Sequence, residues 1–250
     1  IVRTTAIPLA SYPYSSTSRI VHWLTRTHGK ISTLLKGAQR PKSPFLGEYD
    51  LFNTSELLYF EKRTNTLHTG KECALLHRRP AFNTDWRAMQ TASYLTALFN
   101  KTIPEEAPCP EQFELYEELL DLAEKYGHRV QFILWAELFF STRQGHAPHL
   151  TTCVQCGGAE PSRFCASNGG IVCTSCAKEH KFQTLECPPD ILAVLRAWRN
   201  TEHPASAIKT QLTNKQLTAL HSIMSAFMLY QFNMPTHLRA KAFSYDHNHQ

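Results

Sequence analysis

Hydrophobic residues follow a strand-like pattern through the first 80 residues of the chain. Short runs of β-branched and aromatic residues alternate there with polar turns, a pattern typical of β-strands. The runs that we assign to strands are Arg19–Thr25, Ile31–Leu35, Glu56–Phe60 and Leu67–Leu76, with a turn at Thr64–Asn65 before the last one. Four or five strands with short connections predict a small barrel of the OB-fold type over residues 1–80.

The pattern becomes helical after Pro80, where apolar residues recur every three or four positions. The segment from Val130 to Phe140 is apolar on nearly every side, so we expect it to be a buried central helix. Helix-start signals stand at Thr84 or Asp85, Pro110, Pro188-Pro189 and Thr213. The sequence therefore predicts an α-helical domain over residues 81–149 and 188–236, followed by a flexible polar tail over residues 237–250.

Four cysteines interrupt the helical pattern with the spacing C-x2-C-x16-C-x2-C: Cys153, Cys156, Cys173 and Cys176. Two CxxC pairs separated by about 15–20 residues fit the template of a zinc ribbon. Four thiolates fill the tetrahedron around one Zn²⁺ ion and leave no open position for water, which favours a structural metal over a catalytic one. We expect residues 150–187 to form a ribbon inserted in the helical domain, so the predicted fold class is α+β and multidomain.

The other cysteines give no comparable signal. Paired spacing is absent for Cys73, Cys109, Cys165 and Cys187. Alternative ligands, if one of the four cysteines does not bind, are Cys165, Cys187, His149 and His180. Eight cysteines in 250 residues are too sparse for a disulfide scaffold, and the H-x-E triplet of zinc deaminases is absent.

Cysteine usage and hydropathy also bear on the compartment. The sequence contains no signal peptide and no apolar run near the ~18 residues that a membrane span needs. We therefore expect a reducing, cytoplasmic compartment and no membrane partner. The start at Ile1 instead of Met indicates a processed or trimmed N-terminus.

Positive charge is concentrated at the N-terminal end, although the net charge is only +5. Residues 1–45 contain no Asp or Glu, and such an imbalance favours a nucleic-acid partner over a merely solvated basic face. The candidate DNA-binding residues are Arg3, Arg19, Arg26, Lys30, Lys36, Arg40 and Lys42, the last three in a mobile loop over residues 36–44.

Three aromatic residues lie among these bases. Tyr12 and Tyr14 stand in a Ser/Pro-rich segment that we interpret as a turn, where they are free to stack on unpaired bases. Trp23 is favoured as a residue of the barrel core.

No catalytic motif supports an enzyme. Phosphate-binding, dinucleotide-binding and zinc-protease motifs are all missing. An acidic run could suggest a divalent-metal site, but its helical spacing favours a solvated helix face; it comprises Glu111, Glu114, Glu117, Glu118 and Asp121. We therefore predict a binding protein without catalytic residues.

Three basic segments resemble the start of the bacterial recombination mediator family RecO: Tyr14–Thr25, Gly29–Ser32 and Lys36–Ser43. The run Pro148-His-Leu-x-x-Cys153-x-x-Cys156-Gly157, with Gly169-Gly170 and the second cysteine pair, resembles the zinc ribbon of that family. The resemblance spans the chain and implies an OB-fold followed by a helical domain with the ribbon inserted.

The resemblance also implies a function in recombinational DNA repair, carried out near the nucleoid. Members of the family bind single- and double-stranded DNA and anneal complementary strands. They act with RecR, recognise the C-terminal tail of SSB and help to load RecA. Two other classes stay open on the residues alone. One is a zinc-ribbon adaptor of transcription or translation, and the other is a zinc-dependent nucleic-acid enzyme.

Overall fold

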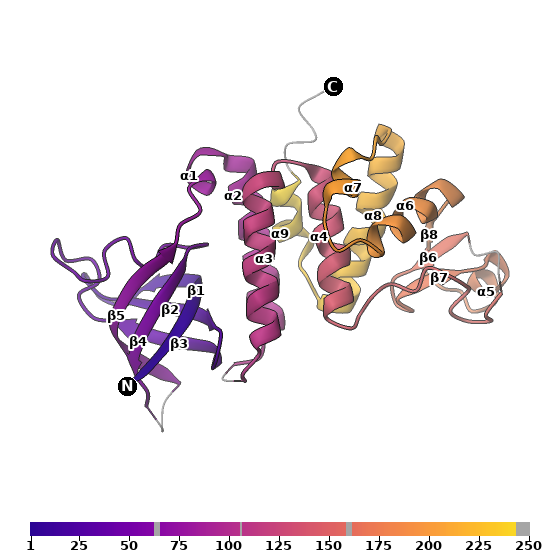
Figure 1. Cartoon of the computed structure of the whole chain (residues 1–250). Helices are drawn as coiled ribbons and strands as arrows, with labels where there is room; N and C mark the ends of the chain where they lie inside the picture. The colour runs from indigo at the N-terminus through magenta and orange to yellow at the C-terminus, as the bar shows by residue number, and fades with distance from the viewer. Residues whose placement is uncertain (63–65, 106, 159–161, 244–250) are drawn as a thin grey trace. The chain divides into compact units, whose positions relative to one another are not determined.

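The computed structural model describes residues 1–62, 66–105, 107–158 and 162–243 (Figure 1). The turn predicted at Thr64–Asn65 lies outside the described residues. The chain forms two compact units, Ile1–Lys125 and Tyr126–Gln250. The first unit contains the strands of residues 1–80 together with the first three helices.

The first unit begins with a closed five-stranded barrel in the order β1-β2-β3-β5-β4 (Figure 1). Its pairings are antiparallel except for the parallel pair β3–β5. The strands are β1 (Val2–Pro13), β2 (Arg19–Thr25), β3 (Gly29–Leu35), β4 (Thr54–Phe60) and β5 (Leu67–His77). The barrel confirms the predicted OB-type fold, and each of the four predicted strands lies within an observed one.

The sequence pattern missed β1. Its middle residues, Ala6 to Leu9, are buried without alternation, and the pairing with β2 shifts register between Pro8 and Ala10. A period-two pattern cannot reveal such a strand, because the shift interrupts the alternation of inward and outward side chains. Tyr12 consequently lies in β1, opposite Ile20, and the prediction of a turn at this residue was wrong.

The barrel interior is filled by side chains that the strands direct inward. Trp23 has no solvent exposure, and its indole N–H donates a hydrogen bond of 2.8 Å to the Thr33 hydroxyl. Leu35, Leu57 and Tyr59 pack in the same cluster. The interpretation of Trp23 as a core residue is thus confirmed, and its ring is unavailable for stacking on a nucleic-acid base.

Three helices complete the first unit: α1 (Ala81–Thr84), α2 (Trp86–Thr102) and α3 (Pro110–Tyr126), which ends one residue beyond it. Asp85 caps α2, since its carboxylate accepts from the backbone N–H groups of Arg87 and Ala88. The apolar faces of α2 and α3 meet where Thr96 shares a buried 2.7 Å hydrogen bond with Tyr116.

The second unit is built around α4 (Val130–Arg143), whose residues from Phe132 to Ser141 are all buried. This confirms the expected central helix. The helices around it are α6 (Pro189–Arg199), α7 (Ala205–Lys209), α8 (Asn214–Phe232) and α9 (Thr236–Ala242). Thr213 starts α8 with a capping box that it shares with Gln216.

Helix α9 corrects the prediction of a flexible tail from residue 237. Arg239 is only 2% exposed, and its guanidinium donates two hydrogen bonds of 2.6 and 2.9 Å to the fully buried Glu137 carboxylate on α4. The same group lies over the ring of Phe243, 4.2 Å from its centroid. A polar composition concealed this anchor, because a buried ion pair uses the residue types that normally mark exposed chain. Residues 244–250 lie outside the described residues.

The cysteine-rich segment folds as β6 (Arg163–Cys165), β7 (Gly170–Val172), α5 (Thr174–Glu179) and β8 (Leu185–Glu186). The strands form a small sheet in the order β7-β6-β8. Arg196 on α6 stabilises the start of this segment by donating hydrogen bonds to the carbonyl oxygens of Leu150 and Thr151. Gln231 on α8 donates to the Ala166 carbonyl at 2.9 Å. The ribbon is thereby fixed to the helices of its own unit.

Candidate metal centre and nucleic-acid interface

Two tight turns bring the four predicted cysteines together. The first pair, Cys153 and Cys156, precedes β6, and the second pair, Cys173 and Cys176, stands at the start of α5. Their four Sγ atoms lie within 4.8 Å of one another, and Cys156 Sγ is 3.9 Å from Cys173 Sγ. A tetrahedron of sulfurs around one Zn²⁺ has edges of about 3.8 Å, given Zn–S bonds of about 2.3 Å. The cluster is positioned to bind a metal ion.

Backbone N–H groups point at these sulfurs and favour the thiolate form. The N–H of Cys173 donates to Cys153 Sγ at 3.3 Å, and the N–H of Cys176 donates to Cys173 Sγ at 3.4 Å. Desolvation by itself raises the pKa of Cys153, but the N–H donors from Cys173, Cys156 and Gln155 outweigh it and lower the pKa to about 6. The pKa of Cys176 is raised, first by its hydrogen bond with the Cys173 thiol. Such an array readily loses protons to a metal ion.

Among the described residues, the metal-binding cluster does not include any of the alternative ligands predicted from the sequence. The His149 imidazole instead faces the hydroxyl groups of Thr151 and Thr152, at 3.1 and 3.0 Å. Cys165 Sγ lies 3.2 Å from the Ser167 hydroxyl. Burial raises the pKa of Cys187 to about 11, so this thiol stays protonated.

The seven predicted DNA-binding residues fall into two groups. Lys36, Arg40 and Lys42 are exposed in the segment between β3 and β4, and no carboxylate of the described residues forms an ion pair with them. The backbone N–H of Gln39, within this segment, donates a 2.9 Å hydrogen bond to the Thr17 carbonyl. Arg19 is half-buried beside the amide group of Gln39.

The other three predicted bases contact acidic or carbonyl groups. Arg3 lies 3.7 Å from Glu56. Lys30 has a side chain only 12% exposed, and its ammonium donates to the Asn100 carbonyl at 2.9 Å. Arg26 contacts the Glu117 carboxylate at 3.3 Å. The sequence identified these residues as cations but could not show that the fold already supplies partners for them.

An aromatic pair lies on the outer face of β1 and β2. Tyr12 is 50% exposed, and its ring is in edge contact with that of His22, with 5.3 Å between the centroids. Tyr14, 60% exposed, follows in the turn. Burial lowers the pKa of His22; Glu105 opposes this and Lys30 adds to it, so the ring is mainly neutral at pH 7. The sequence reading missed His22, although its position next to inward-facing Trp23 places it on the outer face.

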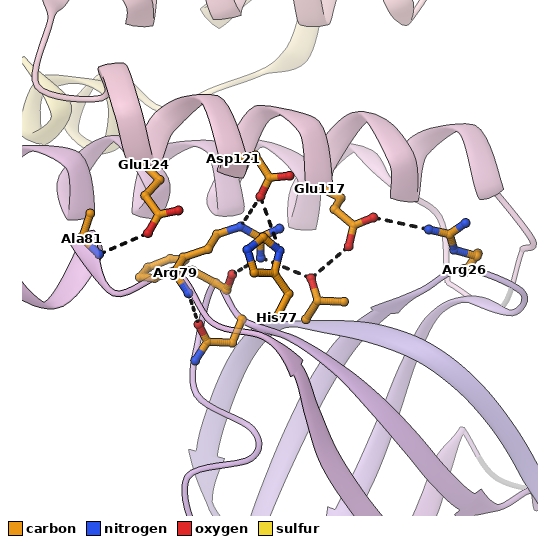
Figure 2. Close-up of polar contacts among 10 residues, drawn as sticks. Arg26, His77, Arg79, Ala81, Glu117, Asp121 and Glu124 are labelled. Carbon is orange, nitrogen blue, oxygen red and sulfur yellow. Dashed lines mark hydrogen bonds and ion pairs between the residues drawn. The ribbon is translucent and has the colours of Figure 1, made fainter.

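Part of the acidic run on α3 contacts the barrel, so the expectation of a solvated face is correct for Glu111, Glu114 and Glu118 but incomplete for Glu117 and Asp121. Asp121 accepts a 2.7 Å hydrogen bond from the Arg79 guanidinium, and Glu117 accepts one of 3.0 Å from Thr54 (Figure 2). We call this set the barrel–α3 seam; its residues are Arg26, Thr54, His77, Arg79 and Ala81 on one side and Glu114, Glu117, Asp121 and Glu124 on the other. Glu111 and Glu118 are exposed, as predicted.

Comparison with known proteins agrees with this arrangement. The family described as "Recombination protein O N terminal" matches residues 1–79, and the one described as "Recombination protein O C terminal" matches residues 83–239. Together these matches cover most of the chain. The chain belongs to the RecO family.

Curated RecO relatives match over most of their own length. The chain is similar to "DNA repair protein RecO" of Rhodopirellula baltica, with 29% identity over 84% of this chain and 79% of the relative. It is similar to "DNA repair protein RecO" of Exiguobacterium sibiricum, with 27% identity over 91% of this chain and 90% of the relative. Membership in RecO places the chain in a DNA repair family. Within the described residues, no helix has the length and apolar character needed to cross a membrane.

Proposed function

We propose that this chain is a non-catalytic recombination mediator that binds DNA through the OB-type barrel and anneals complementary strands. The observation that carries the proposal is the exposed basic segment with Lys36, Arg40 and Lys42 on the barrel of a RecO-family chain. Cations without a carboxylate partner are the ones that phosphates can recruit at least cost.

Phosphate neutralisation accounts for annealing without catalytic residues. Lys and Arg displace counterions from DNA, and a surface that binds two strands lowers their mutual repulsion and raises their local concentration. Tyr14, Tyr12 and His22 supply exposed or half-exposed rings at the edge of the same barrel, and such rings stack on unpaired bases. Arg19 adds a half-buried cation, whereas Arg3, Arg26 and Lys30 contribute less because they already contact other groups.

The family supplies the expected partners. By resemblance to RecO, the chain acts with RecR on single-stranded DNA coated by SSB, recognises the SSB C-terminal tail and assists the loading of RecA. The metal in the four-cysteine cluster is proposed to be Zn²⁺ with a structural role, because an all-sulfur tetrahedron suits this ion and leaves no ligand position for substrate.

The basic segment is tested by Lys36→Ala, Arg40→Ala and Lys42→Ala in one protein. We expect affinity for a fluorescent single-stranded oligonucleotide to fall on the order of 10- to 100-fold, and the slope of log affinity against log salt to decrease by about 2, since each phosphate contact contributes roughly 0.7. The matched control replaces three exposed lysines, Lys125, Lys209 and Lys215, by Ala. It removes the same charge and should change affinity less than about twofold.

The same proteins are then compared in annealing of complementary, SSB-coated oligonucleotides across a salt series. Annealing by the wild type that weakens with salt and is lost in the triple variant supports the mediator function. DNA binding without annealing would instead favour the zinc-ribbon adaptor. Equal loss in the triple variant and the lysine control would show that the basic segment has no special role.

A further inference from the structure

Helix α3 carries acidic side chains against the cations of the barrel. Arg26 lies between two of them, with its guanidinium 3.6 Å from Glu114 and 3.3 Å from Glu117. It also lies over the ring of Phe113, 5.0 Å from the centroid. One cation of the acid-free N-terminal segment is therefore held by two carboxylates and an aromatic face of one helix.

The seam contains a buried part and an exposed part. The Arg79 side chain has no solvent exposure, and besides Asp121 it donates to the Phe52 carbonyl and the Thr54 hydroxyl at 2.6 and 3.2 Å (Figure 2). The Arg26 side chain is 43% exposed and that of Glu114 is 60% exposed. Exposed ion pairs such as those of Arg26 exchange readily with solvent ions. Asp121 is itself 44% exposed, but the Arg79 cation is buried, so opening its contacts leaves an uncompensated charge. The Arg26 contacts can open while Arg79 keeps the helix on the barrel.

We propose that the acidic face of α3 is an intramolecular competitor of DNA: Glu114 and Glu117 hold Arg26 away from phosphates, so that the ion pairs and a phosphate contact at Arg26 exclude each other. The inference rests on the proposed DNA-binding function. It assigns to α3 a role in setting how many phosphates the barrel binds, beyond that of packing.

The geometry supports competition because a phosphate and a carboxylate use the same donors. Both accept two parallel N–H bonds from a guanidinium. Glu117 is kept in place by the Thr54 hydroxyl through its other oxygen, so it is pre-positioned for Arg26. DNA must displace these contacts before Arg26 becomes available.

The test is Glu114→Gln with Glu117→Gln, in which the glutamine oxygen can still accept from Thr54. Affinity for a single-stranded oligonucleotide should rise about three- to tenfold, and the salt slope should steepen by roughly 0.7, the value of one phosphate contact. The matched control is Glu111→Gln with Glu118→Gln. Both carboxylates are exposed on the same helix and have no ion pair with a described residue.

Arg26→Ala in both backgrounds makes the test specific. The substitution should abolish the gain of the Glu114/Glu117 variant, and it should lower the affinity of that variant more than the affinity of the wild type, in which Arg26 is already paired. An equal gain in the Glu111/Glu118 control, or a gain that survives Arg26→Ala, would reduce the effect to general charge and overturn the proposal. No gain in a folded variant, with the Lys36/Arg40/Lys42 protein still defective, would overturn this proposal alone. Absence of DNA binding by the wild type would overturn the proposed function as well.

Discussion

At the scale of single residues, the four cysteines positioned to bind a metal ion form a sharply defined candidate site. Cys153→Ser replaces one soft thiolate by a hydroxyl, so metal affinity should fall by more than the roughly 10- to 100-fold typical of losing an outer-shell partner. Metal content after dialysis against a competing chelator measures this loss. Cys165→Ser is the control, since this sulfur lies beside Ser167 and outside the cluster; equal metal loss in both proteins would contradict the assignment.

The cluster of these cysteines could be predicted from the sequence because each pair is local, with two residues between the cysteines. The seam could not be predicted in this way. Arg79 and Asp121 are 42 positions apart, and both are residue types that usually lie on the protein surface. Only the fold shows that the Arg79 side chain has no exposure. Local spacing therefore reveals a site when its ligands share a turn, and it fails when a charge finds its partner across two elements.

At the scale of elements, the pattern of hydrophobic and polar positions predicted the central helices and most of the barrel. The prediction of a flexible C-terminal tail was wrong where α9 forms. The signals that succeeded extended over many residues, such as the nearly continuous apolar run that became α4. Helix α9 has seven residues, too few to show a clear period. Its position depends on the buried Arg239–Glu137 pair, which no pattern within α9 encodes.

Arg239→Met tests this anchor. The substitution leaves the Glu137 carboxylate buried without its cation, so the free energy of unfolding should fall by about 3–5 kcal/mol. Urea denaturation followed by circular dichroism measures the change. Glu137→Leu added to Arg239→Met removes the stranded charge and should recover most of the loss. A loss below about 1 kcal/mol in the single variant would show that the ion pair does not hold α9.

At the scale of the whole molecule, the two units predict a local response to metal removal. Arg196 and Gln231 fix the ribbon to helices of the Tyr126–Gln250 unit. Structural Zn²⁺ contributes about 10–16 kcal/mol in small zinc modules, as much as the roughly 5–15 kcal/mol that stabilises a domain. The ribbon should therefore unfold without metal, while the barrel keeps its own core around Trp23.

Hydrogen exchange before and after chelation under reducing conditions measures this prediction. Peptides covering residues 150–187 should lose protection by at least about 100-fold, because the metal free energy exceeds what the small ribbon sheet can replace. Protection of peptides from residues 1–80 should change less than about twofold. The metal-free protein should still bind DNA with the wild-type salt slope, since Lys36, Arg40 and Lys42 lie on the barrel. Re-addition of Zn²⁺ should restore the ribbon. Equal loss of protection in both units would mean that the metal supports the whole chain, and no loss anywhere would exclude a structural metal.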